Sequence, residues 1–171
     1  MTSRSTPLVV MIIGVAVLAS TLGAKPMPRL MWNASESVPR GLYRVRLIES
    51  LAVGDLVVVM PPEPLTMFMA KRRYLPVAVP LIKHVLALPG QSVCRNEGLI
   101  TIDGMTMGIA LTRDRHDHAL PVWQGCRLIA QDEVFLMNPG EPASFDGRYF
   151  GPVPRTTIMG RAESMLTLRK E

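Results

Sequence analysis

Residues 81–90 have the sequence LIKHVLALPG, an apolar run of strand length that contains one lysine and stops at Pro89-Gly90. Residues 56–60, LVVVM, are rich in β-branched side chains and stop in the same way, at Pro61-Pro62. Short apolar runs that end at turn residues are typical of buried strands. We therefore predict two buried strands, one of which carries Lys83.

The segments around these two runs have the same character. Two short apolar runs flank Asp103-Gly104, which predicts a β-hairpin with a type I′ turn. The Pro- and Met-rich residues 61–80 predict a long excursion rather than a core element, and the polar residues 110–126 predict a loop. Strands are expected at 41–48, 56–60, 81–88, 99–102, 105–107, 133–137 and from 158 to 163.

The composition agrees with a strand-rich domain. The 171 residues are 48% apolar and 19% charged, which excludes disorder for most of the chain. The 15 prolines and 13 glycines show no period and argue against a helix bundle. We expect an all-β domain, mainly an antiparallel barrel or sandwich, preceded by an apolar helix at the N-terminus.

Several function classes are excluded by what the sequence lacks. The net charge of +5 allows a nucleic acid or an anionic membrane surface as partner. The basic residues form no long stripe, however, and there are only four phenylalanines, so we expect no nucleic-acid groove. Neither a phosphate-cradling glycine motif nor a metal-ligand spacing is present, and we expect no cofactor and no metal.

The N-terminus indicates a compartment. Residues 5–24 carry no charge and lie between Arg4 and Lys25, the layout of a secretory signal peptide or a membrane anchor. We divide the chain into residues 1–24 as this segment, 25–33 as a connector and 34–171 as the domain, which we place in the periplasm at the outer face of the inner membrane. In an oxidising compartment Cys94 and Cys126 are expected to form a disulfide rather than remain buried thiols.

Two residue positions suggest a chemistry. Lys83 lies among apolar neighbours, and burial would lower the pKa of its amine until it could accept a proton from a serine. The alternative is a lysine that reaches water from a strand face. Ser37 precedes Pro39, which restricts the loop, and Ser35 points to the same side if the segment is extended, as an oxyanion donor would.

Four motifs in order resemble those of type I signal peptidases, most closely the plasmid-encoded TraF conjugal-transfer peptidases. They are Ser35-x-Ser37-x-Pro39, Gly54-Asp55 with the strand after it, Lys83-His84-Val85 through Pro89-Gly90, and Ser144-x-Asp146-x-Arg148 with Gly160-Arg161-Ala162 beyond. Two positions depart from the typical pattern. Gln91 stands where signal peptidases usually have Asp, and Val38 where they usually have Met.

The resemblance implies a signal peptidase-like fold and a role for each residue of the site. Ser37 is the nucleophile, Lys83 the general base and Ser35 the oxyanion donor. Ser144 orients the lysine amine, and an ion pair of Asp146 with Arg148 fixes its loop. Three histidines are left without a catalytic role: His84, His116 and His118.

The same resemblance implies a function. It indicates a serine endopeptidase that processes a conjugative pilin precursor and leaves it cyclic if an amine resolves the acyl-enzyme. The alternatives are an ordinary signal peptidase and a non-catalytic envelope component of the mating-pair apparatus; a LexA-like repressor would have a DNA-binding head instead of the apolar segment. Within 61–80, Met67, Phe68, Met69, Tyr74 and Leu75 predict either a surface that dips into the inner membrane or a loop folded over the domain.

Overall fold

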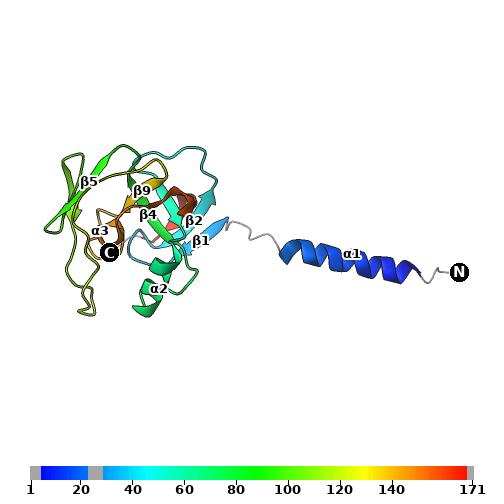
Figure 1. Ribbon diagram of the computed structural model, residues 1–171. Coiled ribbons are helices and arrows are strands. Elements are labelled where there is room, and N and C mark those ends of the chain that lie inside the picture. Colours follow the sequence, from blue (N-terminus) through cyan, green and yellow to red (C-terminus); the bar gives the residue numbers. More distant parts are fainter. Residues whose placement is uncertain (1–4, 23–28, 169–171) are drawn as a thin grey trace.

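The computed structural model describes residues 5–22 and 29–168, and the strands make two antiparallel sheets (Figure 1). This confirms a mainly antiparallel β domain. The larger sheet is open, with β1 and β10 at its edges. In spatial order it contains β1 (Leu30–Asn33), β2 (Gly41–Arg46), β11 (Ile158–Thr167), β3 (Leu56–Val59), β4 (Leu81–Ala87), β9 (Glu133–Met137) and β10 (Val153–Pro154).

The smaller sheet extends from the β4–β9 side of the larger one. Its spatial order is β7 (Met105–Ile109), β6 (Leu99–Ile102), β5 (Ser92–Asn96) and β8 (Gly125–Leu128). The predicted hairpin is β6–β7, and Asp103 and Gly104 have φ of 48° and 82°, both positive as a type I′ turn requires. Every predicted strand is present, while β1, β5 and β8 were not predicted.

The buried run of β3 explains how the core is built. Val57 and Val59 pack in one hydrophobic cluster with β4, β9 and β10, and Val58 packs in another with β2 and β11. Successive side chains of a strand point to opposite faces, so a strand buried on both sides needs apolar residues throughout. A third cluster joins the smaller sheet to β9 through Phe135 and Met137.

The helical segments of the described residues differ in how they relate to these sheets. The helix α1 (Ser5–Leu22) lies apart from the strands in Figure 1, and the large apolar side chains from Leu8 to Val17 are exposed. Among the residues described, no helix meets the length and hydropathy that crossing a membrane requires. The short α3 (Gly147–Phe150) follows β9, and a 3-10 turn (Arg155–Thr157) leads into β11.

Two predicted segments need correction. The end of the predicted connector 25–33 is a strand, because Leu30–Asn33 form β1 and pair with β2. Residues 25–28 of the connector lie outside the described residues. The excursion 61–80 contains the helix α2 (Glu63–Lys71). Proline is compatible with the first turn of a helix, where the missing N–H has no partner to lose, so the Pro-rich start of this segment does not exclude one.

The apolar side chains of 61–80 also pack inward. Met69 is 2% exposed, and Phe68 and Tyr74 both lie against Phe145. Of the five residues expected to form a lipid-facing surface, only Met67 is exposed by more than half. The packing of these residues agrees with a segment that folds over the domain, and a lipid-facing surface stays a prediction for the exposed side chains alone.

A disulfide links the first and last strands of the smaller sheet in chain order. Cys94 of β5 and Cys126 of β8 are directly opposite in register and are joined at an S–S distance of 2.04 Å. The bond closes a loop across a sequence separation of 32 residues. In the chain-entropy model, a loop of this size restricts the unfolded chain by about 3–4 kcal/mol.

We predict that replacing Cys94 and Cys126 together by serine lowers the free energy of unfolding of the full chain by about 3–4 kcal/mol. Urea denaturation followed by tryptophan fluorescence measures the change. Wild-type protein kept in a reductant should match the double variant, whereas equal stability of oxidised and reduced protein would contradict the prediction.

Candidate active site

The loop between β1 and β2 carries the two serines. Ser35 Oγ and Ser37 Oγ are 2.9 Å apart, and Val38 behind them is buried in the cluster that includes Tyr43. The loop returns to the sheet at Gly41, where φ is +151° and a Cβ would lie 2.0 Å from the Leu166 carbonyl oxygen. Only glycine fits there, which gives a structural reason for Gly41 two residues after the Ser35-x-Ser37-x-Pro39 motif.

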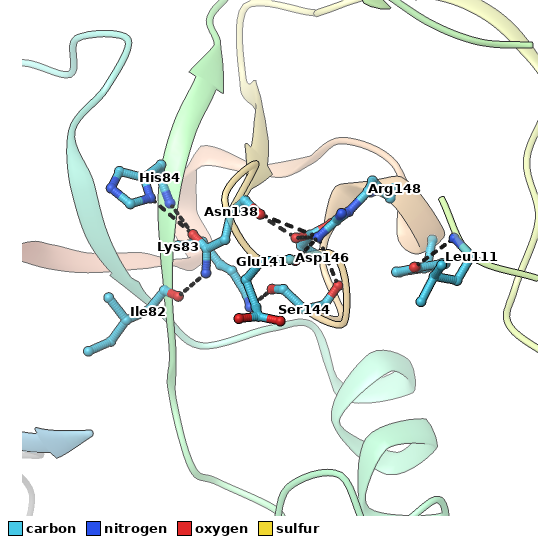
Figure 2. A network of polar contacts seen from close by, with 10 residues as sticks. Ile82, Lys83, His84, Leu111, Asn138, Glu141, Ser144, Asp146 and Arg148 are labelled. Carbon is cyan, nitrogen blue, oxygen red and sulfur yellow. Dashed lines mark hydrogen bonds and ion pairs between the residues drawn. The ribbon is translucent and has the colours of Figure 1, made fainter. Parts of the chain in front are cut away.

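Lys83 lies on β4 and is 2% exposed, so it is buried and does not reach water. Its Nζ donates a hydrogen bond to Ser144 Oγ at 2.6 Å, as Figure 2 shows. Burial lowers the pKa of Lys83 to about 8; Arg148 lowers this pKa as well, while the carboxylates of Asp146 and Glu141 raise it. With a pKa near 8, about a tenth of the amine is neutral at pH 7.

The side-chain amide of Asn138 holds the backbone of β4 on both sides of Lys83. Asn138 Oδ1 accepts the His84 backbone N–H at 3.1 Å, and Asn138 Nδ2 donates to the Ile82 carbonyl at 3.2 Å. His84 Nδ1 also lies 3.1 Å from Asn138 Oδ1, so the histidine ring is engaged beside the strand. Asn138 is itself buried. These contacts fix the backbone from which the Lys83 side chain extends (Figure 2).

The loop that carries Ser144 depends on a buried ion pair. Arg148 Nε and Nη2 donate to the two carboxylate oxygens of Asp146, both at 2.9 Å, and the two side chains are 1% and 0% exposed. Arg148 Nη2 also donates to the carbonyls of Glu141 at 2.7 Å and Ser144 at 3.2 Å. The pair thus fixes the backbone of Ser144.

An aromatic cluster covers the same loop from outside. Phe145 stacks on Tyr149 with ring centroids 5.5 Å apart, and on Phe68 of α2 at the same distance. The ring centroid of Tyr74 lies 5.3 Å from that of Phe145, and the Tyr74 hydroxyl donates a hydrogen bond to the Asp114 carboxylate. The helix α2 therefore supports the Ser144 loop, a role that the Met- and Pro-rich composition of its segment did not indicate.

These elements meet at one cavity of about 720 Å³. Its wall includes Ser35, Ser37, Lys83 and Ser144, so the structure brings the predicted serines and lysine to one site. His116 also lines this cavity, although both His116 and His118 are exposed. Much of the remaining wall is apolar, with Met31, Val79, Ile82, Leu111, Leu120 and Phe145. Such a wall suits an apolar peptide side chain beside a few polar groups.

No metal site competes with this interpretation in the described residues, where no group of three or more His, Cys, Asp or Glu side chains is placed to hold an ion. The cavity wall carries the hydroxyls of Ser35, Ser37 and Ser144 together with the buried amine of Lys83, which is hydrogen-bonded to Ser144. A serine hydroxyl and a neutral amine that share one cavity are the components of an activated nucleophile and its base.

Comparison with known proteins shows the family to which the chain belongs. The family model described as "Signal peptidase, peptidase S26" matches residues 3–167, and the chain belongs to this family of serine peptidases. A probable conjugal transfer protein TraF of Sinorhizobium fredii is 37% identical over 147 residues, which are 79% of this chain and 76% of that protein. A conjugal transfer protein TraF of Agrobacterium fabrum is 34% identical over 145 residues, 79% of this chain and 81% of that protein.

A crystal structure of a signal peptidase I from Enterococcus faecalis is also similar. The match covers 67% of this chain and 97% of the signal peptidase chain, at 17% sequence identity and a TM-score of 0.41.

We predict that Arg148→Met lowers the free energy of unfolding by about 3–5 kcal/mol, because it leaves the Asp146 carboxylate buried without its partner. Arg46→Met is the matched control, since Arg46 and Glu163 form an exposed pair whose loss should cost about 1 kcal/mol or less. Urea denaturation of both full-length variants measures the difference. Equal losses would show that the buried pair is no more important than the exposed one.

Proposed function

We propose that the protein is a serine endopeptidase that uses Ser37 as nucleophile and Lys83 as general base. The observation that carries the proposal is the Lys83 amine, buried and held by Ser144, in the cavity that Ser37 also lines. A surface lysine at pH 7 is almost entirely charged and has no lone pair to accept a proton. Burial of Lys83 removes that obstacle.

The proposed reaction has two steps. The Ser37 Oγ–H proton moves to Lys83 Nζ while Oγ bonds to the carbonyl carbon of the scissile peptide, and the negative charge develops on the carbonyl oxygen. The backbone N–H of Ser37 and the Ser35 hydroxyl are the proposed donors to that oxygen. The carbon–nitrogen bond then breaks, and the leaving amine takes the proton from Lys83. In the second step, water or an amine gives a proton to Lys83 Nζ and bonds to the acyl carbon. The bond from that carbon to Ser37 Oγ then breaks, and Oγ takes the proton back from Lys83.

A conjugative pilin precursor is the proposed substrate. The support is the similarity to proteins named for conjugal transfer, over 79% of the chain. We place the domain at the outer face of the inner membrane, reached through the segment 1–24. An ordinary signal peptidase acting on secreted proteins, and a non-catalytic component of the mating-pair apparatus, are the alternatives. The buried amine disfavours the non-catalytic alternative, because burying a lysine whose hydrogen-bond partner is a neutral hydroxyl is costly.

We predict that Ser37→Ala and Lys83→Met each lower kcat for a pilin-precursor peptide by about 10²–10⁴-fold without unfolding the protein. His84→Gln is the matched control, because His84 is the neighbour of Lys83 on β4 and should keep near-normal kcat. Cleavage is measured by chromatography of full-length protein with peptide. Retained activity in Lys83→Met would refute the proposed base.

The pH dependence follows from the Lys83 pKa of about 8. Only the neutral amine accepts a proton, so kcat/KM should rise with pH through about 8 and level off above it. Glu141→Gln removes a carboxylate that favours the charged amine, and the acid limb should move to lower pH. A limb near pH 6.5 that disappears in His84→Gln would instead identify a histidine base.

The product distinguishes hydrolysis from cyclisation. If an amine of the same pilin chain resolves the acyl-enzyme, the product mass is one water below that of the trimmed linear peptide. We expect this mass in pilin isolated from cells with the protein and not from cells with Ser37→Ala. A linear product would favour ordinary signal peptidase chemistry, and unchanged precursor would favour the non-catalytic alternative.

A further inference from the structure

Asn33 is a buried amide beneath the loop that carries the serines. It is the last residue of β1, is 7% exposed, and stands opposite Gly41 in the β1–β2 register. The loop of residues 34–40 is therefore closed at its base by the Asn33–Gly41 pair. A buried amide needs partners for its oxygen and its two N–H groups.

The donors of Asn33 hold the loop backbone. Asn33 Nδ2 donates to the carbonyl oxygens of Ser35 at 3.0 Å, Val38 at 3.0 Å and Pro39 at 3.2 Å. These acceptors determine the orientation of the amide, because the flipped form would place Oδ1 against three carbonyl oxygens. The Asn33 oxygen must then face the other side of the loop, toward Ser35.

The Asn33 oxygen takes the hydrogen of the Ser35 hydroxyl. Oδ1 accepts the Ser35 backbone N–H at 3.1 Å and the Ser35 Oγ–H at 2.7 Å. A serine hydroxyl has one hydrogen to donate. In its 2.9 Å contact with Ser37 Oγ, Ser35 is therefore the acceptor and Ser37 the donor.

The result is a directed chain of hydrogen bonds from Ser37 to Ser35 to Asn33. It holds the Ser37 oxygen at one place above the loop and points its hydrogen at Ser35. It also means that Ser35 gives its hydrogen to Asn33 in this structure. In the proposed reaction both hydroxyls must therefore rotate about their Cβ–Oγ bonds, Ser37 to give its hydrogen to Lys83 and Ser35 to donate to the oxyanion, while the two oxygens stay where the chain has placed them.

We propose that Asn33 is a positioning residue for the nucleophile, acting through the Ser35 hydroxyl on the Ser37 Oγ. The proposal rests on the function proposed above, in which Ser37 attacks the peptide. Because attack depends on the position of the reacting oxygen, misplacement of Ser37 lowers the rate of the chemical step more than the binding of the peptide.

A double-mutant cycle between positions 33 and 35 tests the proposal. In full-length wild-type protein, Ser35→Ala should lower kcat by about 10–100-fold and leave KM within about threefold. The Asn33→Ala variant should show a loss of similar size, and adding Ser35→Ala to it should cost at least about threefold less than Ser35→Ala costs in the wild type, the remaining loss being that of the proposed oxyanion donor. Losses that multiply would overturn the proposal, because Asn33 would then act independently of Ser35.

Two further variants separate positioning from loop stability. Tyr43→Phe is the matched control: the Tyr43 hydroxyl donates to the Pro39 carbonyl of the same loop at 2.6 Å but does not contact Ser35. It should lower the melting temperature and leave kcat within about twofold. A drop in kcat for Tyr43→Phe as large as that for Asn33→Ala would assign Asn33 a purely structural role and overturn the proposal.

The second variant, Asn33→Asp, keeps an oxygen facing Ser35 and removes the N–H donors to the three loop carbonyls. It is used in place of Asn33→Ala if Asn33→Ala does not fold. When Ser35→Ala is added to Asn33→Asp, it should still cost about 10–100-fold in kcat, because the acceptor for Ser35 remains. A loss below about threefold would overturn the proposal. Absence of peptide cleavage by the wild type would refute the proposed function instead, and is distinct from either outcome.

Discussion

The site depends on one constraint, that the amine of Lys83 is held in the protein interior and, among the described residues, forms no ion pair, although the charges of Asp146 and Glu141 act on it. Its hydrogen-bond partner is the neutral Ser144 hydroxyl. The nearby Asp146 carboxylate is engaged by Arg148 through two hydrogen bonds, so its charge is largely balanced before it acts on the lysine. A free carboxylate in that place would favour the ammonium form and raise the pKa of Lys83. The ion pair thus maintains the position of Ser144 and limits how far the Asp146 charge raises the pKa of Lys83.

The surrounding structure holds this arrangement through contacts on several sides. The strand β4 has β3 on one side and β9 on the other, and Asn138 bridges its backbone around Lys83. The aromatic rings of α2 and of the segment after it close over Phe145. Arg95 of the smaller sheet adds a contact from behind, since its Nη1 donates to the Arg148 carbonyl at 2.5 Å. Each layer of the fold contributes to one short loop.

Local pattern predicted the strands whose side chains are buried on one or both faces. The runs at 56–60, 81–88 and 133–137 contain β3, β4 and β9, because apolar, β-branched residues are what a two-sided sheet core requires. The strands β1, β5 and β8 are short and mix polar with apolar residues, so their stability comes from pairing partners far along the chain. The helix α2 was missed because its prolines lie at its start, where a helix tolerates them.

The chemistry of the site was only partly visible in the sequence. Ser35, Ser37, Lys83, Ser144, Asp146 and Arg148 stand in short motifs and line the cavity or support it. The two amides Asn33 and Asn138 lie next to those motifs, but their partners are backbone groups whose proximity the fold creates. An asparagine in a sequence is equally compatible with a turn, and nothing local indicates which backbone atoms it will face.

The position of β11 in the larger sheet has a consequence for how the candidate site is assembled. The loop that carries Ser37, the proposed nucleophile, lies between β1 and β2, Lys83 lies on β4, and β11 lies between β2 and β3 and pairs with both. The strand that joins these two parts of the site is thus the one that follows all the other described strands in the chain. The sheet that aligns Ser37 with Lys83 is therefore complete only when the last described strand is in place.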